Sequence, residues 1–173
     1  MRGFFVEGEK SWLELGEIER ALLASLLGQV VQLLDLQEAA SSDPFDFLND
    51  LGKKAERPQD EVVFRLLPDA YSEDDEANND FRKFTEQSLR EEKITRAKAV
   101  LAQLPKTDDP IEIAPDTVAA WLKSLNDVRL ALGTRLEITE DFLPINKEDE
   151  EKLSLLEVYD WLTWLQGTIL EIA

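Results

Sequence analysis

The sequence predicts a mainly α-helical bundle with a small β-hairpin at its N-terminus. The chain has 173 residues, which is enough to bury one core without disulfides or metals. It is 43% hydrophobic and has only seven glycines and seven prolines, a composition typical of a globular protein. After Gly16 the apolar residues recur mostly at helical spacing. We therefore expect a single domain over residues 1–173, with the hairpin at 3–15 and the helical bundle at 17–173.

The hairpin is predicted by two apolar segments that flank a turn. "GFFVE" (3–7) and "SWLEL" (11–15) lie on either side of "GEK", where Gly8 can take the positive φ of a tight turn. A two-stranded ribbon is only marginally stable alone. We expect "IEI" (111–113) to add a third strand.

Two helices are expected in the first two thirds of the chain. Residues 18–36 carry a broad apolar arc that begins at Ile18, which favours a central helix. Residues 41–61 resemble a loop with a short helical piece at 45–51. A second helix is predicted from about residue 73 towards Leu104, because Ser72 and Asp75 resemble a capping box and Pro105 stops the helix.

Two further helices are expected in the last third. One should begin at Pro115 and end at Gly133, a residue that suits a left-handed C-cap. The last should begin at Asn146 with Asp149 and continue almost to Ala173. Between Leu153 and Ile172 twelve of twenty positions are apolar, so most of its circumference must be covered. The first helix and hairpin of the same chain, or a second copy in a homodimer, could provide the cover, and both alternatives stay open.

The chain contains neither cysteine nor histidine. It therefore lacks disulfides, thiolate nucleophiles, the commonest general base and the usual zinc ligands. Paired carboxylates are a weak signal among 37 acids. The acidic segment "EDDEANND" (73–80) does not follow the calcium-loop spacing and has no glycine at the turn. We predict no enzymatic activity, no catalytic residues, no cofactor and no metal site.

The charge balance argues against nucleic acid as a direct partner. Thirty-seven acids and nineteen bases give a formal charge of −18, which repels a phosphate backbone. The densest basic segment, "REEKITRAKAV" (90–100), holds Arg90, Lys93, Arg96 and Lys98. On a helix these four spread around the axis, so we predict a solvated helix surface with no stripe for DNA.

A cytoplasmic location is expected. No segment approaches the roughly 18 unbroken apolar residues of a membrane span. Glu7 and Glu9 interrupt the N-terminal segment where a signal peptide needs an apolar core. We predict no association with a membrane.

Arg129, within "SLNDVRLALGTRL" (124–136), is the residue that most needs a partner. At about 100° per residue from Trp121, Arg129 falls at about 80°, between Leu132 at about 20° and Leu122 at about 100°. A charge on an apolar arc costs free energy unless it is paired. We predict that Arg129 is largely buried and pairs with a carboxylate of the helix that begins near Ser72. The candidate polar network comprises Arg129, Asn126, Asp127, Arg82, Asp74, Asp75 and Asn78.

Two roles for this network stay open. It can simply orient two helices through arginine–carboxylate pairs. It can instead form part of a ligand pocket or a switch.

Three segments carry a family resemblance: "FRLLPDAYSEDDEANNDFRKFTEQSLREEK" (64–93), "WLKSLNDVRLALGTRLEI" (121–138) and "YDWLTWLQGTIL" (159–170). Together they resemble an actinobacterial family with a domain of unknown function, the AosR-like oxidative-stress-responsive transcription regulators. The resemblance implies a cytoplasmic, mainly helical regulator that works through the transcription machinery, notably a sigma factor. It also implies a redox mechanism with a cysteine pair near the N-terminus. Here that segment reads "MRGFFVEGEKSW", so thiol sensing is excluded.

Charge and resemblance together predict a non-enzymatic protein-interaction module. Its acidic surface suits a basic protein partner, such as a sigma factor or RNA polymerase. The high negative charge could equally serve only solubility. The alternative function is a small-molecule or ion-binding protein of unknown ligand that uses Arg82, Arg129 and Asp74.

Overall fold

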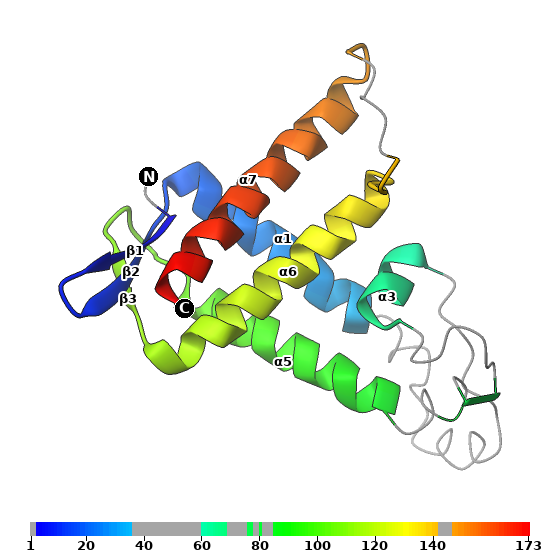
Figure 1. Ribbon diagram of the computed structural model, residues 1–173, viewed down its shortest axis with the longest axis horizontal. Helices are drawn as coiled ribbons and strands as arrows, with labels where there is room; N and C mark the ends of the chain where they lie inside the picture. The colour runs from blue at the N-terminus through cyan, green and yellow to red at the C-terminus, as the bar shows by residue number, and fades with distance from the viewer. Residues whose placement is uncertain (1–2, 36–59, 69–75, 78–79, 81–84, 142–146) are drawn as a thin grey trace.

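A computed structural model describes residues 3–35, 60–68, 76–77, 80, 85–141 and 147–173. The long helices are α1 (Glu17–Asp35), α5 (Gln87–Gln103), α6 (Val118–Arg135) and α7 (Glu150–Ile172). A small sheet lies at one end of this bundle, and the short helix α3 (Glu61–Leu66) lies at the other (Figure 1). The predicted fold class, a mainly helical bundle with an N-terminal hairpin, is confirmed.

The sheet has three antiparallel strands in the order β1 (Gly3–Glu7), β2 (Lys10–Glu14) and β3 (Ile111–Ile113). Gly8 has a φ of 67° in the two-residue turn, as predicted. Phe4 pairs with Leu13, and both are buried. The Phe4 ring meets Trp121 edge-on, with centroids 5.4 Å apart. The sheet thereby closes one end of the helical core.

Strand β1 is attached directly to α7. The Phe4 backbone N–H donates to Thr168 Oγ1 over 3.0 Å. Gly3 makes this approach possible, since a Cβ at this residue would lie only 2.8 Å from the same oxygen. Its φ of 65° is also one that glycine adopts without strain. A glycine at this position therefore serves both backbone conformation and close packing.

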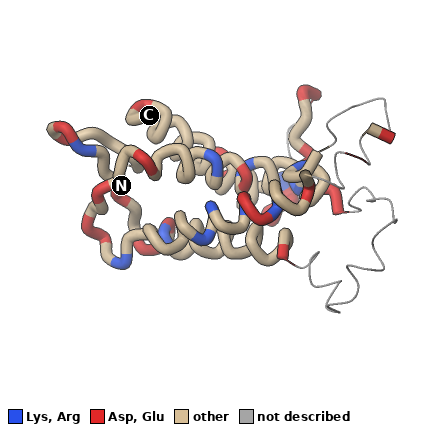
Figure 2. The backbone as a smooth tube through the Cα atoms, turned by 90° about the horizontal axis from the view of Figure 1, so that it is seen from below, with Lys and Arg blue, Asp and Glu red and all other residues tan. Residues whose placement is uncertain are grey.

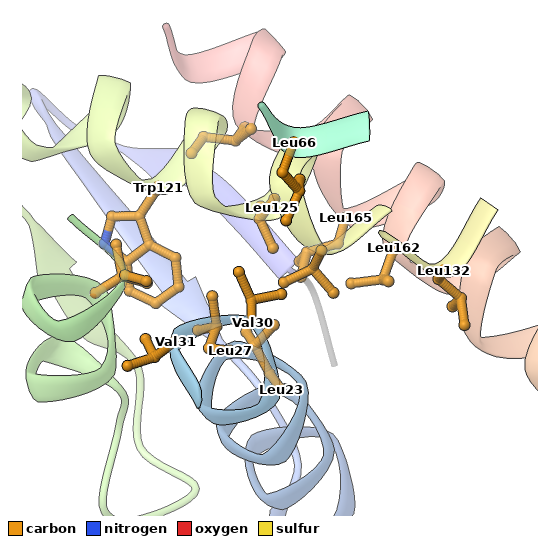
Figure 3. Packing of buried hydrophobic residues seen from close by; sticks show 14 of the residues in the cluster. Leu23, Leu27, Val30, Val31, Leu66, Trp121, Leu125, Leu132, Leu162 and Leu165 are labelled. Atoms are coloured by element: carbon orange, nitrogen blue, oxygen red, sulfur yellow. The ribbon is translucent and has the colours of Figure 1, made fainter. Parts of the chain in front are cut away.

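The bundle is centred on α6, and not on the first helix as the sequence suggested. Helix α6 contacts α1, α3, α5 and α7 (Figure 1). Leu23, Leu27 and Val30 of α1 point towards side chains of α6 and α7, including Leu125 and Leu165 (Figure 3). The start of α1 takes no part in this core, because Ile18 is 83% exposed.

Helix α6 begins after the 3₁₀ turn Pro115–Thr117, in agreement with the prediction for Pro115. The predicted end at Gly133 is wrong, since the helix continues to Arg135 and the left-handed residue is Glu137, with a φ of 56°. Gly133 instead allows close packing. A Cβ there would lie 3.3 Å from Cε2 of Tyr159 on α7.

The other predicted helix ends can be compared only in part. Helix α5 ends at Gln103, just before Pro105, and α7 begins after the N-cap Asp149, whose side chain accepts from the Lys152 N–H. The predicted starts at Ser72 and Asn146 and the helical piece at 45–51 lie outside the described residues. Helix α3 was not predicted, although its N-cap Asp60 accepts from two backbone N–H groups of the first turn.

Candidate functional site

Asp127 is the centre of a buried ionic cluster between α5 and α6. Its side chain is 7% exposed, and its two oxygens bind different cations. Lys93 Nζ lies 2.6 Å from Oδ1, and Arg96 Nη2 lies 2.8 Å from Oδ2. In this cluster the carboxylate is on α6 and the cations are on α5, whereas the sequence suggested an arginine on α6 and a carboxylate on the preceding helix.

The basic segment at 90–100 is not the solvated surface that the sequence suggested. Arg90 is 4% exposed and donates to the Leu34 carbonyl and to Glu86 Oε1. Lys93 and Arg96 are also largely covered, whereas Lys98 is exposed. The prediction failed because a projection of α5 alone cannot include its neighbouring helices. Acceptors on α1 and α6 compensate the buried charges.

Arg129 has a different environment from the one predicted. It is half-buried, and its Nη1 donates to Gln166 Oε1 on α7 over 2.6 Å. Its guanidinium carbon lies 5.4 Å from the centroid of the Tyr159 ring. No carboxylate among the described residues contacts it, and its Nε is buried without a hydrogen-bond partner there. Arg129 lies at the edge of the buried arc of α6, which explains its partial exposure.

A cavity of about 470 Å³ lies beside Arg129, between α3, α6 and α7. Asn126, Gly133 and Tyr159 contribute to its wall. The charged lining residues are Arg65, Glu61, Glu137 and Arg129, of which only Arg129 is partly buried. Apolar lining comes from Leu130 and Ile138. The cavity thus combines one partly buried cation with an aromatic and aliphatic wall.

A second cavity, of about 490 Å³, borders the Asp127 cluster. It is lined by Lys93, Arg96 and Asp127 together with Gln166 and Asn126. Asn126 lines both cavities, and the Arg129–Gln166 hydrogen bond joins a lining residue of each. Asp127 and Arg129 are therefore close together on α6, but each lines a different cavity.

The structure places three of the seven predicted network residues and leaves the rest outside its described part. Arg129, Asn126 and Asp127 lie together on α6. Asp74, Asp75, Asn78 and Arg82 lie outside the described residues. Sequence reasoning missed Lys93, Arg96, Tyr159 and Gln166. None of the four carried a local signal, because each lies 30 or more positions from its partner on α6.

Within the described residues no group of three or more acidic side chains could hold a metal ion. In the same part of the chain, no helix is both long enough and apolar enough to cross a bilayer. The fold and these two polar sites define a helical protein with a buried ionic cluster and a cavity lined by one partly buried cation.

The chain belongs to a family that is described as a domain of unknown function, DUF2017, whose model matches residues 1–173. A protein of Mycobacterium bovis and one of Mycobacterium tuberculosis, both named oxidative stress regulator AosR, are each 36% identical to it. Each match covers 92% of this chain and 80% of the relative. A Mycobacterium leprae relative is 35% identical over 86% of this chain and 75% of its own length. No solved structure matches. The family resemblance expected from the sequence is confirmed.

Proposed function

We propose that this protein is a non-enzymatic regulator that acts by binding a basic protein partner of the transcription machinery, such as a sigma factor or RNA polymerase. The observation that carries the proposal is the relation to proteins named oxidative stress regulators across nearly the whole chain. The formal charge of −18 supports a basic partner, because complementary fields speed encounter and fix orientation.

The charge distribution supports binding through protein surfaces and not through nucleic acid. Basic residues are scattered along the tube in Figure 2 and do not gather in one run. Three of the four in the segment 90–100 are engaged internally with acidic or carbonyl groups. These three side chains are therefore not available to contact a phosphate backbone.

The outer side of α7 offers a docking surface of suitable chemistry. Glu157, Asp160, Trp164 and Glu171 are all exposed, and at about 100° per residue they fall within an arc of about 60°. We call these four residues the acidic face of α7. Trp164 is 40% exposed, and the one cation of α7, Lys152, lies in its first turn. An exposed aromatic residue surrounded by carboxylates suits a basic partner that also buries apolar area.

Signal reception in this chain must differ from thiol oxidation. The 173 residues contain no cysteine, so no disulfide switch can form within them. Any response to oxidants would then follow a route other than thiol oxidation, such as through its partner or through a bound ligand.

Binding of the full chain to purified sigma factors and RNA polymerase core of its host tests the proposal. We expect saturable binding to at least one of them, weaker at about 150 mM salt than at about 50 mM. The variant Glu157→Lys with Asp160→Lys should lower the affinity and the association rate. The control Glu140→Lys with Asp141→Lys changes the net charge equally at two other exposed residues and should bind nearly normally.

Two results would contradict the proposal. If the chain bound none of the sigma factors and did not bind the polymerase core, the proposed class of partner would be wrong. Equal binding by the α7 variant and the wild-type chain would remove the acidic face of α7 as the contact surface.

A further inference from the structure

Arg129 is exceptional among the cations that the protein keeps from full solvent exposure. In the described part of the chain there are five such residues: Arg20, Arg90, Lys93, Arg96 and Arg129. The first four each contact a carboxylate, that of Asp108, Glu86 or Asp127, with Glu92 as a second contact of Arg96. Arg129 contacts an amide oxygen and a ring instead. In a chain with 37 acids and 19 bases, a half-buried arginine without a carboxylate is unexpected.

The guanidinium of Arg129 is held in place before any ligand arrives. Gln166 accepts from Nη1, and the Tyr159 ring lies against the planar group. Gly133 leaves room for that ring, with 3.3 Å between Tyr159 and the position of the missing Cβ. Nη2 makes no hydrogen bond to any described residue. It is also not one of the fully buried atoms without a partner. A fixed guanidinium with free N–H groups beside a cavity is a preorganised anion site.

We propose that the cavity between α3, α6 and α7 binds a small organic monocarboxylate, with its carboxylate on Arg129. This site goes beyond the proposed regulatory role and does not depend on it. The carboxylate would accept from the free N–H groups of Nη1 and Nη2, which present the planar geometry that suits two carboxylate oxygens. The body of the ligand would lie against Tyr159, Leu130 and Ile138 in the same cavity.

The charges at the rim favour a singly charged ligand. Glu61 and Glu137 line the cavity and are exposed, as is Arg65. The two rim carboxylates outnumber the one rim cation, so the rim would repel a phosphate dianion or a tricarboxylate more strongly than a ligand with a single carboxylate and an apolar body. The volume of about 470 Å³ accommodates such a molecule together with water.

Calorimetric titration of the full chain with sodium butyrate and sodium benzoate tests this site, with phosphate and citrate at matched ionic strength as comparisons. We expect saturable binding of at least one monocarboxylate, tighter than that of phosphate or citrate. Arg129→Gln should weaken this binding about tenfold or more, because it removes a charge-assisted pair. Arg129→Lys should also weaken it, since an ammonium lacks the planar fork. The control Arg135→Gln removes an exposed cation of the same helix that does not line this cavity, and should bind normally.

A second variant covers the case in which Arg129→Gln fails to fold. Thr139 is exposed and lines the cavity, so Thr139→Trp should fill it and abolish monocarboxylate binding while leaving the core intact. The proposal is overturned if neither butyrate nor benzoate binds saturably, or if phosphate or citrate binds more tightly. It is equally overturned if binding survives Arg129→Gln or Thr139→Trp in folded protein.

Discussion

The guanidinium of Arg129 lies against the ring of Tyr159, 5.4 Å from its centroid, and this contact joins α6 to α7. One turn along α6, Gly133 meets the same ring, where a Cβ would lie 3.3 Å from Cε2. The position of the ring therefore depends on both residues. It matters for the cavity, because all three residues line it.

Gly133→Ala should destabilise the protein or leave its stability unchanged, although alanine is the better helix former by about 1 kcal/mol. The added methyl group would lie closer to Tyr159 than an ordinary van der Waals contact allows. Moving the ring to make room would disturb its contact with Arg129. Urea unfolding compares the free energies of unfolding. Gly28→Ala on α1 and Gly167→Ala on α7 are matched controls, since nothing lies within 4 Å of the added Cβ. Each should stabilise by about 0.5–1 kcal/mol. A similar gain at Gly133 would contradict the close contact.

Arg129→Ala should lower the free energy of unfolding by about 1–2 kcal/mol. This is less than the loss of about 3 kcal/mol expected when a buried ion pair is broken. The reason is that the partner left behind is the neutral Gln166 amide on a half-buried site. A double-mutant cycle with Gln166→Ala should give a coupling energy of about 1 kcal/mol. A cost above about 4 kcal/mol would instead indicate a carboxylate partner for Arg129.

Asp127→Ala should be among the most destabilising substitutions, at about 3–5 kcal/mol, because it leaves two covered cations without their carboxylate. Lys93 and Arg96 have side-chain exposures of only 13% and 12%. Chemical denaturation of the variant measures the loss. Glu112→Ala breaks the exposed pair with Lys10 and serves as the control, with an expected change below about 1 kcal/mol. Similar losses in the two variants would contradict the special role of Asp127.

The parts of this fold that the sequence predicted depend on local signals. Gly8 indicates the hairpin turn, Pro105 and Pro115 mark helix boundaries, and Asp149 caps α7. The end of α6 was mispredicted because Gly133 serves tertiary packing and not capping. Helix α3 is too short, at six residues, to produce a helical repeat.

The candidate site was predictable only on α6. Helical projection placed Asn126, Asp127 and Arg129 on one helix, as in α6, but it put Arg129 within the apolar arc, whereas the residue lies half-buried at the edge of that arc. Partners on other helices depend on the tertiary arrangement. Arg129 meets Gln166 because α6 and α7 pack side by side, and Asp127 meets Arg96 because α5 lies on the other side of α6.

The last prediction concerns the oligomeric state, for which the sequence left two alternatives. On α7 the inner face is covered by its own chain, with Leu162, Leu165 and Ile169 at 0% exposure. Other apolar residues of this helix, including Leu155, Leu156 and Tyr159, are partly buried against the same core.

What remains exposed on α7 is too divided to form a standard interface. Trp164 and Leu170 are 40% and 58% exposed, but at about 100° per residue they point about 120° apart. Trp164 also lies among carboxylates, so two copies of this face would repel each other. We therefore expect light scattering after size exclusion to give 19.7 kDa at micromolar concentration. Twice that mass, reduced to a monomer by Leu170→Lys but not by Trp164→Lys, would instead identify the Leu170 side of α7 as a homodimer interface.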